Sequence, residues 1–189
     1  MRHPSLLDRQ RAVAVVIDLQ ESYRRILDGW DGVEARTAML MVGVRQLGVP
    51  VLLTEQYPRG LGHTSARVAE HLDADVPVIE KTTMSCCGQP RFMEALEATG
   101  RRQVLVSGIE AHACVNQTVH DLIHRGFEVH LARDTTGSRH ADLVEPAWER
   151  MRSVGMLPTT AEQALLELVR TAEAPEFRTI QGLLKESSP

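Results

Sequence analysis

Three side chains that could together carry out acyl chemistry each follow a separate apolar run of the sequence. Asp18 and Lys81 come directly after two such runs, and Cys114 lies at the start of a helical stretch that follows a third. A cysteine attacks a carbonyl carbon as its thiolate, a carboxylate can take the thiol proton, and an ammonium group can stabilise the charge. The unpaired amides at a helix start also favour negative charge and can hold an oxyanion. We therefore hypothesise that these residues form a catalytic set, and that the pKa of Cys114 lies below the ~8.5 of a free cysteine.

Each of the three residues also has a plainer interpretation. A single cysteine at a helix start is more often a small buried residue than a nucleophile. An aspartate after a strand is frequently a turn residue, and a lone lysine is usually a solvated surface charge. The catalytic interpretation is favoured only by the placement of all three residues at one edge of a sheet.

Apolar runs that alternate with helical patterns predict the elements that position these residues. Strands are predicted over residues 12–17, 49–54, 76–80, 103–107 and 127–132, with a short sixth strand over 156–158. Helices are predicted over 34–47, 90–98, 114–126, 139–154, 161–170 and 175–186. This alternation is typical of an α/β fold with three α/β/α layers and a mostly parallel, Rossmann-like sheet of about six strands. Residues 1–189 are expected to form a single domain.

Three details of the predicted helices can be compared with a structure. Thr160 is expected to cap the helix that follows it, and Pro146 to mark an offset or kink within the segment 139–154. The amphipathic segment 175–186 is expected either to cover the body of the protein or to bind a second subunit.

In an open parallel sheet, ligands bind beyond the carboxyl ends of the strands, near the switch in strand order. The three candidate catalytic residues all fall at that edge. Other side chains that adjoin strand ends or Cys114 could line a substrate pocket, although ordinary packing is an alternative for each: Gln20, Tyr57, Met84 and His112.

The composition limits the classes of partner. The 189 residues are 43% hydrophobic and 24% charged, and the net charge is -4. This charge argues against nucleic acid or an anionic membrane as the main partner, and no apolar run approaches the ~18 residues that span a bilayer. The N-terminal stretch has only Leu6 and Leu7 as an apolar pair, which is too little for a signal-peptide core, so a cytoplasmic location is expected. Three cysteines in such a chain predict free thiols.

Four sequence segments in this order resemble the isochorismatase-like cysteine hydrolases. They are VVIDLQESY (15–23), IEKTTMS (79–85), SGIEAHACVNQT (107–118) and ARDTTGSR (132–139), and together they span most of the chain. GIEAHAC and TEQYPRGLGHT look closest to the branch called isochorismatase domain-containing proteins. The resemblance implies a triad of Asp18, Lys81 and Cys114, a cis peptide bond between Ile109 and Glu110, and an oxyanion hole made by the Glu110 and Cys114 amides. It also implies a homo-oligomer, a dimer or a tetramer.

The resemblance further implies hydrolysis of a small-molecule substrate at an amide or related carbon–nitrogen bond, through a thioester on Cys114. Nicotinamidases of the superfamily bind a metal through an Asp-x-His motif and further histidines. Here the corresponding stretch reads Glu55-Gln56-Tyr57, with His63 downstream. One carboxylate and one imidazole are too few ligands, so we expect no metal and no other cofactor, and a nicotinamidase-like amidase is disfavoured.

Two other functions stay open on the same fold. Cys86 or Cys87 could resolve an oxidised Cys114 in a thiol-redox protein, although the sequence has no C-x-x-C motif. A catalytically silent interaction protein is the other possibility, which would be favoured by a missing triad residue, and none is missing. The sequence also leaves two orientations for Glu110, toward a substrate or toward a second subunit.

Overall fold

The computed structural model describes residues 3–73 and 75–186. Over these residues the chain forms a six-stranded sheet in the order β3-β2-β1-β4-β5-β6, and every pair of neighbouring strands is parallel. The strands are β1 (Ala12–Ile17), β2 (Val51–Gln56), β3 (Val78–Lys81), β4 (Gln103–Ile109), β5 (Glu128–Gly137) and β6 (Leu157–Thr159). The switch point lies between β1 and β4, because the connection after β1 leads to β2 on one side and the connection after β4 leads to β5 on the other.

The burial of each strand follows from its position in the sheet. All residues of the central strands β1 and β4 are buried, because helices cover both faces, and this explains their continuous apolar runs. The edge strand β3 alternates between exposed and buried residues, as expected where only one face is covered.

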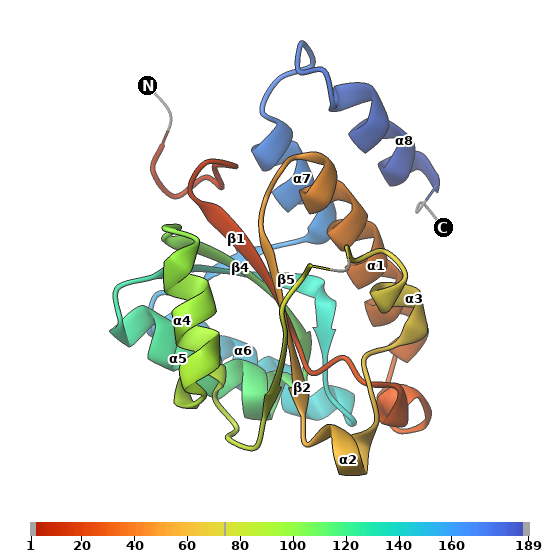
Figure 1. Ribbon diagram of the computed structural model, residues 1–189, viewed down its shortest axis with the longest axis vertical. Coiled ribbons are helices and arrows are strands. Elements are labelled where there is room, and N and C mark those ends of the chain that lie inside the picture. The colour runs from red at the N-terminus through yellow and green to blue at the C-terminus, as the bar shows by residue number, and fades with distance from the viewer. Residues whose placement is uncertain (1–2, 74, 187–189) are drawn as a thin grey trace.

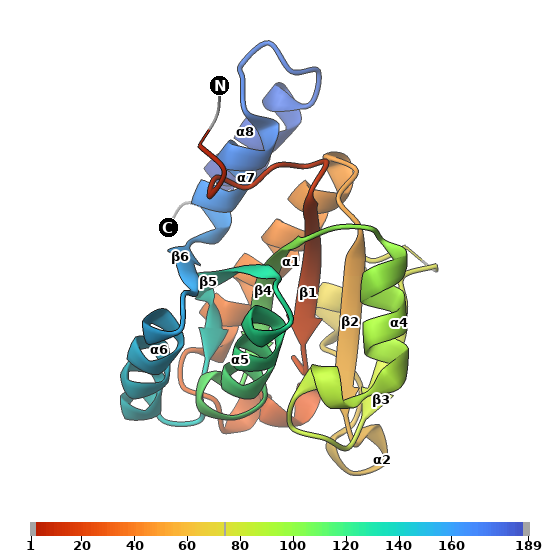
Figure 2. The same cartoon turned by 90° about the vertical axis from the view of Figure 1, so that its left-hand side faces the viewer.

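Helices lie on both faces of the sheet, so the predicted three-layer α/β fold is confirmed (Figures 1 and 2). One layer contains α1 (Trp30–Gln46), α3 (Ala66–Ala69), α7 (Ala161–Val169) and α8 (Phe177–Glu186). The other contains α4 (Pro90–Ala98), α5 (Asn116–His124) and α6 (Val144–Ser153), and the short α2 (Pro58–Leu61) follows β2. Short 3-10 segments cover Glu21–Arg25, Cys86–Gly88 and Ala141–Leu143, and Ala111–Val115 forms a π-helical turn.

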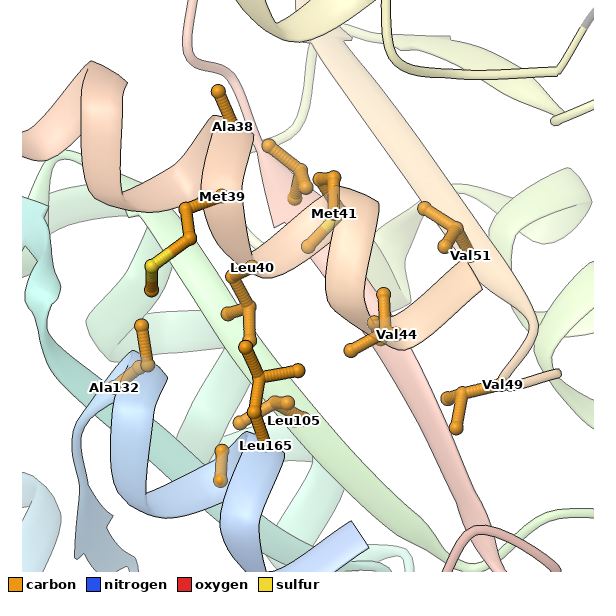
Figure 3. Packing of buried hydrophobic residues seen from close by; sticks show 14 of the residues in the cluster. Ala38, Met39, Leu40, Met41, Val44, Val49, Val51, Leu105, Ala132 and Leu165 are labelled. Carbon is orange, nitrogen blue, oxygen red and sulfur yellow. The ribbon is translucent and has the colours of Figure 1, made fainter. Parts of the chain in front are cut away.

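The layer around α1 contains one of two apolar clusters (Figure 3). Leu40 of α1 belongs to the same cluster as Leu105 of β4 and Leu165 of α7. Gly43 makes this packing possible, because a Cβ atom there would lie 2.4 Å from Leu165 Cδ2. Helix α8 lies against α1 and α7 and buries Ile180, so its apolar face covers the body of the protein.

The structure tests the predicted roles of Thr160 and Pro146. The Thr160 side chain caps α7 as predicted, accepting a hydrogen bond of 3.2 Å from the Gln163 amide. Pro146 causes no kink inside α6, because α6 begins at Val144 and Pro146 lies in its first turn, where the missing amide hydrogen is not needed. The segment 139–154 is instead offset just before Pro146, where the 3-10 turn Ala141–Leu143 gives way to α6.

Several strands end later than their apolar runs indicate. Strands β2 and β3 extend to Gln56 and Lys81, and β5 extends to Gly137. In β5 the register shifts, and Thr136 then pairs with Gly108. These polar extensions carry the strands into the region of the predicted site. No helix in the described part of the chain has the length and apolar character needed to cross a bilayer.

Candidate active site

Asp18 is held at the switch point by the two strands that flank β1. Ile17 pairs with Thr54 of β2 and with Gly108 of β4, and the chain then turns at Asp18, whose φ is 50°. A Cβ atom at Gly108 would lie 2.0 Å from the Ile17 carbonyl oxygen, and the φ of Gly108 is 115°. Glycine therefore allows β4 to approach the backbone that presents the Asp18 carboxylate.

Asp18 and Lys81 form a buried ion pair. Lys81 Nζ lies 2.6 Å from Asp18 Oδ2, and the two side chains are 0% and 3% exposed. Lys81 also donates to Gln56 Oε1 at 2.6 Å and to the carbonyl oxygens of Thr83 and Met84, each at 3.2 Å. Burial is the largest effect and lowers the pKa of Lys81, but the charge of Asp18, the hydrogen bond to it and the nearby Cys86 and Cys114 together outweigh burial, and the pKa of Lys81 is raised.

Cys114 lies beside this pair, in the π-helical turn that continues into α5. Its buried thiol interacts with the side chains of both Asp18 and Lys81, and its Sγ lies 4.0 Å from Met84 Sδ. The structure therefore brings together the three residues that the sequence placed at one edge.

The predicted lowering of the Cys114 pKa is wrong. Burial raises the pKa of the Cys114 thiol to about 12, the charge of Asp18 raises it further, and Lys81 only partly opposes them. Lys81 opposes burial only partly because its charge is already compensated by Asp18 at 2.6 Å. The resting thiol is consequently protonated at neutral pH.

Glu110 points toward its own chain. Its carboxylate accepts hydrogen bonds from the Arg139 amide at 2.9 Å, from Arg139 Nε at 3.1 Å and from an Arg139 Nη at 2.9 Å. Of the two orientations considered above, toward substrate or toward a second subunit, neither describes this side chain. The peptide bond between Ile109 and Glu110 is cis, and the Glu110 carbonyl accepts from the amides of Ala113 and Val115.

The four candidate pocket residues have different surroundings. Tyr57 and Met84 are about half exposed, and Tyr57 borders a 330 Å³ cavity together with Lys81. His112 Nδ1 lies 3.0 Å from Ser138 Oγ. Of the four residues, only Tyr57 lines this cavity. The buried carboxamide of Gln20 bonds to the backbones of Gln56 and Gly62 and so joins the end of β2 to the following loop.

Sequence reasoning missed several residues that contact the site. Thr54 Oγ1 donates to Asp18 Oδ1 at 2.7 Å, and Gln56 accepts from Lys81. These two positions are two residues apart at the carboxyl end of β2 and so share one face of the strand, which is a signal the sequence contained. Tyr23 is also near the site. Its pKa is raised mainly by burial, and it is raised further by the charges of Glu110 and Cys114.

Glu55 faces the loop on the other side of β2. Its carboxylate accepts from the Thr64 amide at 2.7 Å and from the Thr64 hydroxyl at 2.8 Å, and it lies 3.0 Å from His63 Nδ1. Within residues 3–73 and 75–186, no cluster of three or more His, Cys, Asp or Glu side chains is arranged to hold a metal ion. The Glu55 carboxylate instead anchors the loop.

Comparison with known proteins places this chain in a family. A family model described as the isochorismatase domain matches residues 12–163, so the chain belongs to the isochorismatase family and has the hydrolase fold of that family. The resemblance inferred from the sequence motifs is thereby confirmed.

Individual relatives agree with this assignment. Isochorismatase domain-containing protein 2 of Danio rerio is 37% identical over 185 residues, which are 97% of this chain and 91% of the relative. Isochorismatase domain-containing protein 1 of Salmo salar is 38% identical over 91% of this chain, but this chain spans only 60% of that relative's length. The solved structure of the MAR1 ribonuclease from Caenorhabditis elegans has a TM-score of 0.92 and 34% identity, covering 97% of this chain and 94% of that one.

Proposed function

We propose that this protein is an amidohydrolase that cleaves a small amide or related carbon–nitrogen bond through a thioester on Cys114. The observation that carries the proposal is the buried thiol beside the Asp18–Lys81 ion pair.

In this mechanism Asp18 acts as a general base rather than as the partner of a preformed thiolate. Because the resting thiol is protonated, Asp18 takes the proton as Cys114 Sγ attacks the carbonyl carbon. The Glu110 and Cys114 amides are assigned to the resulting oxyanion. The protonated Asp18 then gives its proton to the departing amine, and the carbon–nitrogen bond breaks to leave the thioester.

Water completes the cycle. Asp18 takes a proton from water as the water oxygen attacks the thioester carbonyl, and the carbon–sulfur bond breaks to release the carboxylic acid. Asp18 returns its proton to the Cys114 sulfur. Throughout, the Lys81 ammonium is held in place by four acceptors, one of which is Asp18, and so keeps that carboxylate oriented. Its positive charge also stabilises negative charge on the sulfur.

A thiol-redox function is less consistent with the burial of the other cysteines. Cys86 is fully buried, and burial raises the pKa of its thiol to about 12. The pKa of Cys87 is raised to about 11, first by burial. Both thiols are therefore protonated at neutral pH, the state that reacts slowly with oxidants and with disulfides.

A ribonuclease function is suggested by the names of three structural relatives, the MAR1 ribonuclease of Caenorhabditis elegans and the putative MAR1 ribonucleases of Leishmania major and Leishmania donovani. RNA binding usually depends on a concentration of positive charge, whereas this chain has a net charge of -4. At the site, the cations Lys81 and Arg139 are each paired with a carboxylate of this chain. We therefore favour a small neutral substrate over a polyanion.

The test combines an amide panel with trapping of the thioester. The native protein is incubated with small primary and secondary amides, the reaction is quenched with acid, and the acyl-enzyme is located by mass spectrometry. Release of a hydroxamate by hydroxylamine then identifies the acyl group as a thioester. We expect acylation at Cys114, loss of turnover in Cys114→Ala, and full turnover in Cys87→Ala, the matched control. Turnover that survives Cys114→Ala, or cleavage of RNA but of no amide in the same preparation, would overturn the proposal.

A further inference from the structure

Thr54 contacts Asp18, the candidate base, through both its side chain and its backbone. It is fully buried, its Oγ1 donates to Asp18 Oδ1 at 2.7 Å, and its carbonyl oxygen accepts from the Asp18 amide at 3.1 Å. Lys81 occupies the other carboxylate oxygen, Oδ2. The Asp18 carboxylate is thus held at both oxygens, by Thr54 of β2 at Oδ1 and by Lys81 at Oδ2.

The Thr54 hydroxyl has a second neighbour, Cys86. Its Sγ lies 3.7 Å from Thr54 Oγ1. A hydroxyl has one hydrogen, and Thr54 donates that hydrogen to Asp18, so the Cys86 thiol must be the donor to Thr54. This direction agrees with a protonated Cys86, whose pKa burial raises to about 12.

Cys86 also connects this chain of hydrogen bonds to the nucleophile. The Cys86 amide donates to Thr118 Oγ1 at 3.0 Å, and Thr118 Oγ1 donates to the Cys114 carbonyl oxygen at 2.7 Å. A continuous buried path therefore runs from Asp18 through Thr54, Cys86 and Thr118 to the backbone of Cys114. It joins the strand that supports the base to the helix that carries the thiol.

We propose that Thr54 and Cys86 are positioning residues that keep the Asp18 carboxylate directed at the Cys114 thiol. This inference rests on the proposed function above. Neither residue is assigned a contact with substrate, and both act through Asp18. It gives Cys86 a role as a hydrogen-bond donor in place of the redox role considered from the sequence.

The probe for the test is iodoacetamide, with alkylation of Cys114 measured by mass spectrometry across pH. Thr54→Val keeps the shape of the side chain and removes the hydroxyl. We expect it to slow alkylation of Cys114 at neutral pH roughly tenfold, the scale of a lost hydrogen bond to a charged group. Thr54→Ser should restore the alkylation rate, and Cys86→Ala should slow alkylation less than Thr54→Val does.

Thr37→Val is the matched control, because Thr37 is also fully buried and donates only to the Val33 carbonyl within α1. It should leave the alkylation profile unchanged. Thermal unfolding of each variant identifies any that fail to fold. If Thr54→Val does not fold, the alkylation rate of Cys114 is compared between Thr54→Ser and Cys86→Ala instead.

Two results distinguish the failure of this inference from the failure of the proposed function. A wild-type profile in Thr54→Val, or a loss that Thr54→Ser does not restore, would overturn the positioning role while Asp18→Asn still abolishes amide turnover. Amide turnover that survives in Asp18→Asn would overturn the proposed function itself.

Discussion

Replacing Lys81 with methionine should destabilise the protein strongly, because it leaves the Asp18 carboxylate buried without its countercharge. The ammonium and the carboxylate are 2.6 Å apart, and their side chains are 0% and 3% exposed. Breaking one partner of such a pair costs roughly 3–5 kcal/mol, since the remaining charge keeps its desolvation penalty. With a urea m-value of about 2 kcal/mol/M, the unfolding midpoint should fall by about 2 M at pH 7. Asp18→Asn should cost a similar amount.

The double variant Asp18→Asn/Lys81→Met decides whether the pairing is the cause. Because it removes both charges, its loss should be smaller than the sum of the single losses by at least ~2 kcal/mol. An exposed pair provides the control: Arg133 and Glu145 are 3.7 Å apart with side chains 45% and 63% exposed, so Glu145→Gln should cost less than ~1 kcal/mol. Additive losses in the double variant, or single losses no larger than that of the control, would refute this reasoning.

The pH dependence of this pair has a definite sign. The pKa of Lys81 is raised in the folded state above its ordinary value of 10.5, because the lowering effect of burial is outweighed by the combined effect of Asp18 and the nearby Cys86 and Cys114. The contribution of Lys81 to stability is therefore fully present below pH 10.5 and is lost as the pH rises through the folded value. The urea experiment at pH 7 measures it in full.

Three further variants test the fold around the site, each by urea unfolding. Gly108→Ala should cost roughly 3–5 kcal/mol, because its Cβ would meet the Ile17 carbonyl at 2.0 Å, whereas Gly48→Ala, which has a positive φ but open space, should cost only ~1 kcal/mol. The folded pKa of Cys86 is about 12 against an ordinary 9.0, so its unfolded thiol ionises first and stability should fall from pH 9 toward 12. Cys86→Ala should flatten that decline by about 1.4 kcal/mol per pH unit. Thr160→Ala should lose ~1 kcal/mol of capping energy that Thr160→Ser retains. A uniform loss in all variants, or an unchanged alkaline slope, would contradict these assignments.

The elements that were predicted most accurately are those whose period is set by burial. The strand at residues 12–17 and the helix at 90–98 have the predicted bounds, because a strand covered on both faces and a helix with one covered face leave distinct patterns. The strand ends near the site were predicted too early. Gln56 and Lys81 are polar, and their place in β2 and β3 follows from hydrogen bonds to neighbouring strands rather than from apolar character.

The electrostatics of the site show the same limit. The sequence placed Cys114 at a helix start with Lys81 nearby, which predicts an acidic thiol. It contained no measure of how deeply the thiol is buried or of whether the lysine is already paired. Both are properties of the packed structure, and together they raise the pKa of Cys114 to about 12.

The sequence by itself determined the α/β class, the order of strands and helices, the family and the edge of the sheet at which Asp18, Lys81 and Cys114 gather. These follow from local periodicity and from motifs, which are properties of short stretches of chain. Only the tertiary structure decided that β1 lies between β2 and β4, that Thr54 supports Asp18 from below, and that Glu110 pairs with Arg139. Contacts of this kind join residues that are far apart in the chain, so they depend on which strands become neighbours and how closely the layers pack.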